Sequence, residues 1–263
     1  MRRLLFNSAV SKLPAMDFSP LDIFSFVFFI GSWLGYSLLA RRAARKRNSL
    51  SSVLYRYRKE WVRKLSISGM SEVDSELLSS LERQVSFLAS TSLLILASLV
   101  TVLSTASDMF MNLSSLRFVT EVSVEVVQMK LLLLLCIFVY GFFTFTWSIR
   151  QYGFCFIVFG SSFHTVKYYR ENEEYNAVAA KRDFGAITKV LDRAAHSYNY
   201  GIRAYYFAMA ALAWFINAWF FIGATAVVIF VLYRREFMSS SLNAMVTARQ
   251  VDNVHDEDEI TFD

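Results

Sequence analysis

The feature that most constrains this chain is an apolar run from Met129 to Ile149, in which Lys130, near its start, is the one charged residue. A helix rises about 1.5 Å per residue, so a run of this length reaches across the roughly 30 Å hydrocarbon core of a bilayer. The chain as a whole is 55% hydrophobic, whereas soluble domains have roughly 45–50% apolar residues. Both observations predict a membrane protein.

Three further apolar segments are long enough to cross a bilayer, at residues 22–40, 86–106 and 204–233. Long apolar runs with only two prolines in the chain favour helices over the short alternating strands of a membrane barrel. The sequence therefore predicts an all-α membrane protein with four transmembrane helices. The last helix is expected to tilt or protrude, because 204–233 exceeds one bilayer thickness.

Residues 152–166 leave the span count open, because the chain stays apolar after Arg150. This segment is shorter than a normal crossing requires, so we expect it to pack on the surface or to re-enter the membrane. The alternative is an additional short span. Four spans place Arg234 and Arg235 on the outer side, against the positive-inside rule, and a fifth crossing removes that conflict.

The loop from Arg41 to Arg83 contains eleven Lys or Arg residues and five acidic residues, so we expect it to face the cytoplasm or the mitochondrial matrix. Within it, LYRYRKEWVRKL places apolar side chains at helical spacing, which predicts an interfacial amphipathic helix on anionic lipid, with cardiolipin as one candidate. A solvated juxtamembrane helix is the alternative. No nucleic-acid-binding fold accompanies the charge. The predicted lipid-binding residues are Arg41, Arg42, Arg45, Lys46, Arg47, Arg56, Arg58, Lys59, Trp61, Arg63 and Lys64.

The ends of the chain differ from its middle in composition. Residues 1–16 are basic and free of acids, which is typical of a mitochondrial targeting segment and equally of an ordinary basic tail. Residues 17–237 form the predicted helical membrane domain, and residues 238–263 an acidic tail. The expected location is the inner membrane of a mitochondrion or of a bacterium.

The first predicted span contains Gly31 and Gly35 at the GxxxG spacing. Small residues at this spacing let two membrane helices approach closely. The motif is weak evidence, because such spacings are common in membrane helices. It indicates one face of this span where a close neighbour fits.

Polar groups at membrane depth are costly without a partner, which draws attention to Arg150 and Asn217. The simpler interpretation of Arg150 is an anchor at the end of its helix, and Lys130 and Arg203 are interpreted as flanking anchors in the same way. The three histidines are dispersed, and no Gly-rich phosphate loop or metal-binding motif is present. We therefore expect no catalytic residues, no metal site and no cofactor.

Four segments resemble a known family: residues 32–42 (SWLGYSLLARR), 55–64 (YRYRKEWVRK), 130–152 and 201–237. They are similar to the family known as domain of unknown function 599, which comprises multi-pass membrane proteins of bacteria and some eukaryotes. The resemblance covers roughly residues 22–237. It implies a helical membrane fold and no particular chemistry, since the family has no assigned activity.

The leading functional hypothesis is a non-catalytic accessory or assembly subunit of a larger, energy-transducing membrane complex, in contact with anionic lipids and other membrane subunits. It rests on extensive apolar surface, two non-membrane extensions and a thin inventory of reactive groups. The alternative is a transporter or channel for a small solute or ion, with Arg150 and Asn217 along its path. That alternative lacks paired, interrupted spans in matching halves.

Overall fold

The computed structural model describes residues 19–44, 49–113, 124–171 and 177–248, and the ordered elements within them are helical. Residues 1–16 and most of the acidic tail lie outside the described residues. The elements are α2 (Pro20–Ala44), α3 (Leu50–Ser68), α4 (Glu72–Leu113), α5 (Val124–Glu171), α6 (Ala177–Leu212), the short 3₁₀ turn η1 (Ala213–Phe215) and α7 (Ala218–Phe237).

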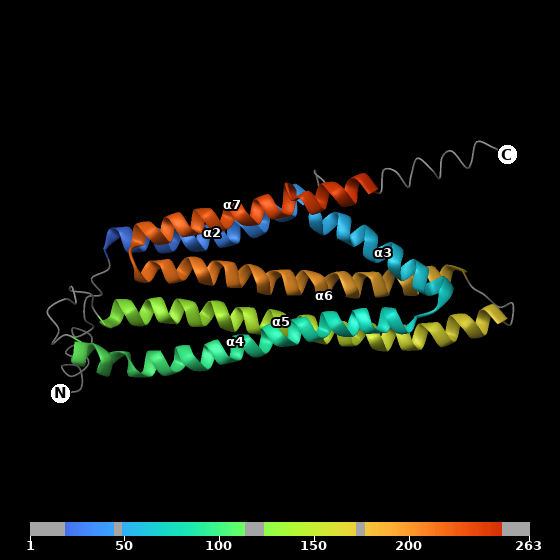
Figure 1. The fold of residues 1–263 in the computed structure, drawn as a ribbon, viewed down its shortest axis with the longest axis horizontal. Coiled ribbons are helices and arrows are strands. Elements are labelled where there is room, and N and C mark those ends of the chain that lie inside the picture. Colours follow the sequence, from blue (N-terminus) through green and yellow to red (C-terminus); the bar gives the residue numbers. More distant parts are fainter. Residues whose placement is uncertain (1–18, 45–48, 114–123, 172–176, 249–263) are drawn as a thin grey trace, which may run out of the picture.

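The helices form an elongated bundle (Figure 1). Helices α4, α5 and α6 run along its length, and α5 packs on both of the others. Helices α2 and α7 lie side by side over one half of α6, while α3 covers the other half. The bundle therefore has one half that contains five helices, α6 among them, and another half that is closed by α3.

In the described part of the chain, four helical stretches are long and apolar enough to cross a membrane: Pro20–Leu39, Glu72–Thr105, Glu125–Gly160 and Ala218–Ala248, the last of which continues past the end of α7. The predicted fold class is confirmed, and the chain is an all-α integral membrane protein. Three of these stretches overlap the spans expected from the sequence at residues 22–40, 86–106 and 129–149, and the first two expected spans end one residue beyond their stretches.

Residues 152–166 are neither re-entrant nor a separate span, because they continue α5 without a break. Tyr152, Cys155 and Phe159 recur at helical spacing and are buried against α6, where Ile187 and Leu191 belong to the same cluster. The apolar character of this segment thus arises partly from a protein core. Hydropathy alone does not separate a core-facing stripe from a lipid-facing one.

The prediction of a single tilted helix over residues 204–233 is wrong. The chain turns through η1, and α7 starts afresh at Ala218, antiparallel to α6 (Figure 1). Asn217 caps α7, its side-chain oxygen accepting a hydrogen bond of 3.1 Å from the backbone N–H of Trp219. No Gly or Pro marks the turn in the sequence, so the capping asparagine was the only local signal.

Helices α5 and α6 pack antiparallel to each other, as two hydrogen bonds between them show. The Ser148 hydroxyl donates a 2.7 Å hydrogen bond to the carbonyl of Ala194, and at the other end Lys130 donates a 2.9 Å bond to the carbonyl of Trp214. Gly141 lies against Tyr205 between these two points. The C-terminal half of α6 therefore lies at the same depth as the predicted span 129–149.

The tightest approach of the two helices is at Gly201. A Cβ atom there would lie 2.6 Å from Cζ of Phe145, a side chain that is fully buried. We expect Gly201→Ala to destabilise the protein by about 1–3 kcal/mol through overpacking. Thermal unfolding in detergent measures the change.

The matched control is Gly185→Ala in the same helix, where a Cβ would meet no atom within 4 Å. This substitution should be neutral or stabilising by up to about 1 kcal/mol, since alanine favours helix over glycine. Equal effects of the two substitutions would contradict the assigned packing.

Candidate functional site

Helices α2 and α7 are held together at one end by aromatic rings. The ring centroids of Phe29 and Phe221 are 5.0 Å apart, and those of Trp214 and Phe221 are 4.9 Å apart. The indole N–H of Trp214 donates a 2.8 Å hydrogen bond to Asp22 in the first turn of α2. This end, which also contains Lys130, is closed by direct side-chain contact.

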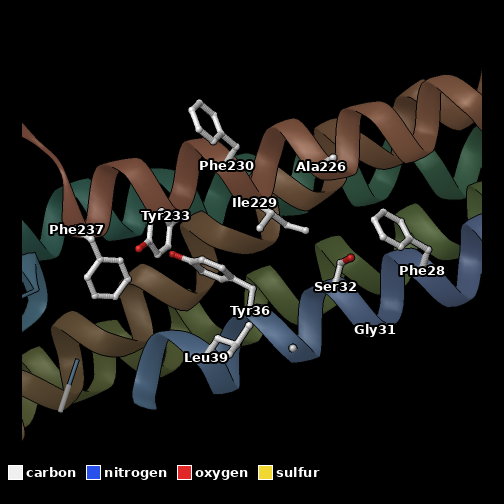
Figure 2. A pocket seen from close by; sticks show the side chains of 11 residues that line it. Phe28, Gly31, Ser32, Tyr36, Leu39, Ala226, Ile229, Phe230, Tyr233 and Phe237 are labelled. Carbon is white, nitrogen blue, oxygen red and sulfur yellow. The ribbon is translucent and has the colours of Figure 1, made fainter. Parts of the chain in front are cut away.

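Beyond this contact the two helices enclose a groove of about 800 Å³ (Figure 2). Each helix contributes five or six residues at the same helical spacing, so one face of each helix forms one wall. The lining residues are Phe28, Gly31, Ser32, Gly35, Tyr36 and Leu39 from α2, and Ala226, Ile229, Phe230, Tyr233 and Phe237 from α7. The repeated spacing was the signal that could have shown this groove in the sequence.

The two glycines of the GxxxG motif face open space. A Cβ atom at Gly31 or at Gly35 would meet no atom within 4 Å, and both residues line the groove. The motif therefore does not bring α2 into close contact with another helix of this chain. It widens the groove instead.

The end of the groove toward the C-terminus of α7 is polar and charged. Arg203 of α6 lies 3.7 Å from Glu236, and their side chains are only 15% and 14% exposed. The guanidinium of Arg203 also lies over the ring of Tyr36, 5.3 Å from its centroid. Glu236 in turn accepts a 3.2 Å hydrogen bond from the backbone N–H of Ser51, which joins the start of α3 to this end.

The predicted lipid-binding residues fall into three groups. Arg41 and Arg42 lie in the last turns of α2, and Arg45, Lys46 and Arg47 lie outside the described residues. The side chains that α3 exposes are Arg56, Lys59, Arg63 and Lys64. Arg58 and Trp61 instead contact protein, because the indole of Trp61 donates a 2.9 Å hydrogen bond to Asp74.

Arg58 joins α3 to α6 through Asp192, at 2.5 Å, and both side chains are less than one-fifth exposed. His196 lies 3.3 Å from the other oxygen of the same carboxylate. Burial on its own would raise the pKa of Asp192, but the hydrogen bonds from His196 and Arg58 outweigh it and lower that pKa. The carboxylate is therefore ionised at neutral pH and fixes the position of α3.

The structure does not bring Arg150 and Asn217 together. Arg150 is exposed on α5 near the middle of the bundle, and Asn217 caps α7 at the end where α6 turns back. Sequence reasoning missed the buried polar contact beside Arg150, in which the Ser197 hydroxyl donates a 3.0 Å hydrogen bond to the side-chain oxygen of Gln151. Within the described part of the chain, no group of three His, Cys, Asp or Glu residues is placed to hold a metal ion.

A family model described as "Protein of unknown function, DUF599" matches residues 24–241. The match covers most of the chain, so the chain belongs to this family. No curated protein matches the chain, and no solved structure does. The matched range includes every residue that lines the groove.

Removing the ion pair between Arg58 and Asp192 tests whether this pair holds α3 against α6. Arg58→Met leaves Asp192 without its closest partner and should weaken the packing of α3 by about 1.5–3 kcal/mol, the usual value of a hydrogen bond to a charged group. Faster hydrogen exchange of the α3 amides would report the loss. Lys59→Met removes a neighbouring exposed cation and should leave α3 exchange unchanged; equal acceleration in both variants would exclude a specific role for the pair.

Proposed function

We propose that this member of the DUF599 family is a non-catalytic accessory or assembly subunit of a larger membrane complex, and that it binds a partner protein through a helical extension outside the bilayer. The energy-transducing inner membrane of a bacterium or a mitochondrion, expected from the sequence, is part of the proposal. The support comes from three features of the bundle: its length, its exposed apolar side chains and the position of its basic residues.

We infer the helical extension outside the bilayer from the position at which α5 enters the hydrocarbon core. If α5 enters the hydrocarbon core near Lys130, a core of roughly 30 Å ends near Arg150. Helix α5 continues to Glu171, which is about 30 Å further at 1.5 Å per residue. Helix α3, the first turns of α4 and the first half of α6 pack beside this part of α5. We infer that these segments project from the membrane as one helical body.

The observation that carries the proposal is a row of exposed apolar residues on the first turns of α4. Val73, Leu77 and Leu81 are 68%, 54% and 39% exposed and recur every four residues, so they lie on one face of the helix. On α5, Phe154 and Ile157 are also exposed beyond Arg150. Apolar rows exposed outside the hydrocarbon core are typical of surfaces that bind another protein.

The alternative, a transporter or channel that uses Arg150 and Asn217, gains no support from their positions. One is exposed on the side of the bundle and the other caps a helix at its end. The groove is lined by α2 and α7 alone (Figure 2), and its lining is apolar. A path between the two sides of a membrane needs polar groups along a common axis, as in known transporters.

The membrane topology that we propose has five crossings and places the basic loop on the inner side. The C-terminal half of α6 accompanies α5 across the bilayer, although its polar N-terminal half keeps it outside the four apolar stretches. The loop after α2 and the end of α7, with Arg234 and Arg235, then lie on the same side. This removes the conflict with the positive-inside rule that four crossings produce.

Epitope accessibility in sealed vesicles tests the crossing number. We expect an epitope in the α4–α5 connection, residues 114–123, and one at the C-terminus to be accessible from opposite sides, since three crossings separate them. An arrangement in which α6 does not cross places both epitopes on one side. That result would refute five crossings and leave the partner surface to be tested on its own.

The partner surface is tested by charge substitution in α4. The wild-type protein, gently solubilised, should migrate on a native gel within a species well above its own 30.3 kDa, and Leu77→Lys with Leu81→Lys should release it. Glu72→Lys adds the same charge at an exposed position of the same helix outside that row and should leave the complex intact. Migration of the wild type as a monomer, or no effect of the double substitution, would contradict the proposal.

A further inference from the structure

We propose that the groove between α2 and α7 binds one acyl chain of an anionic phospholipid from the leaflet on the basic side of the membrane. The wall from Phe28 to Leu39 contains twelve residues and is about 16 Å long at 1.5 Å per residue, which is close to half of the roughly 30 Å hydrocarbon core. These residues form the second half of the apolar stretch Pro20–Leu39. The groove therefore has the length and the depth of a single leaflet.

The chemistry of the walls matches a hydrocarbon chain. The groove is lined almost entirely by carbon, and the absent side chains at Gly31 and Gly35 leave room along the α2 wall. Figure 2 shows Phe28 and Ala226 toward one end and Tyr36 and Tyr233 toward the other. A volume of about 800 Å³ lies in the range of small-molecule sites, which is roughly 300–1,000 Å³.

The length of the groove also favours a lipid chain over a transmembrane helix as its occupant. A partner helix would lie along the full bilayer thickness, but the outer half of this interface is closed by the contact of Phe29 with Phe221. A helix of about 10 Å diameter would meet these rings before it reached the groove floor. A single acyl chain ends at mid-bilayer and needs no space beyond.

Charge at the open end selects the headgroup. The last turn of α7 contains Arg234 and Arg235, both exposed, and the last turns of α2 contain Arg41 and Arg42. Among the residues that the structure describes near this end, the acid Glu236 is paired with Arg203. A phosphate at the level of Leu39 and Phe237 would therefore meet an excess of arginine, and arginine is well suited to phosphate oxygens.

Photo-crosslinking tests the site with a defined probe. The full-length protein is reconstituted in phosphatidylcholine vesicles that contain phosphatidylglycerol with a diazirine at the end of one acyl chain. We expect crosslinks near Phe28 and Ala226, where the chain ends, and not near Phe237. The same probe on phosphatidylcholine should label these positions more weakly.

Filling the groove should abolish the labelling. Gly31→Leu with Gly35→Leu occupies the open space and should reduce crosslinking roughly tenfold, equivalent to about 1.4 kcal/mol of binding. Gly223→Leu makes the same change on α7, at an exposed position that does not line the groove and where a Cβ meets no atom within 4 Å; labelling should persist. Arg234→Gln with Arg235→Gln should lower labelling by phosphatidylglycerol to the level of phosphatidylcholine.

Three outcomes would overturn the proposal. Labelling by both lipids could be equal in the wild type, or the filled groove could be labelled as strongly as the open one. In the third, the glycine substitutions convert an oligomer into a monomer without changing lipid labelling, which would assign the groove to a second copy of the chain. The arginine variant leaves the groove itself unfilled, so it tests headgroup recognition even if the glycine variant fails to fold.

Discussion

The packing of α5 against α6 determines the rest of the structure, because it places the C-terminal half of α6 beside the apolar stretch of α5. Ala204, Ala208 and Ala211 are buried on α6, and Gly201 lies directly against Phe145. Small residues at such an interface let two membrane helices approach closely, which strengthens dispersion contacts where no hydrophobic driving force acts. Helices α2 and α7 then cover much of the remaining surface of α6. Its sequence therefore does not need the hydropathy of a lipid-exposed helix.

Four charged groups near the two ends of the five-helix half have protein partners: Asp22, Lys130, Arg203 and Glu236. These contacts set the spacing of the helices. At one end Trp214 binds both Asp22 and Lys130 through its ring N–H and its carbonyl. At the other end Arg203 and Glu236 join α6 to α7, and Glu236 binds the start of α3. An unpartnered charge at these depths would cost several kcal/mol. The groove lies between two ends that are fixed by such contacts, which explains how an open space persists between α2 and α7.

The sequence predicted the fold class and most of the spans because long apolar runs have one main physical explanation. It did not predict the turn at residues 213–217, since Asn217 is a weak signal within an otherwise apolar run. Arg203 was interpreted as a simple anchor, because its partner Glu236 follows 33 residues later in another helix. The groove was not predicted either, although Gly31 and Gly35 had been noted, because a GxxxG pair is equally compatible with a tight helix contact and with an open wall. Pairings between helices depend on three-dimensional packing that periodicity does not encode.

Residues 152–160 of α5 have two apolar stripes, and the two stripes have different surroundings. Tyr152, Cys155 and Phe159 face α6 and account for one apolar stripe. Phe154 and Ile157 lie on another face and are 40% and 69% exposed. In the extension that we propose, polar residues are the usual choice on such a face. The internal core explains the first stripe, and the described residues leave the second stripe uncovered. Because the row at Val73, Leu77 and Leu81 on α4 is exposed in the same half of the bundle, a partner that covers these side chains would remove a cost that the isolated subunit would otherwise bear in water.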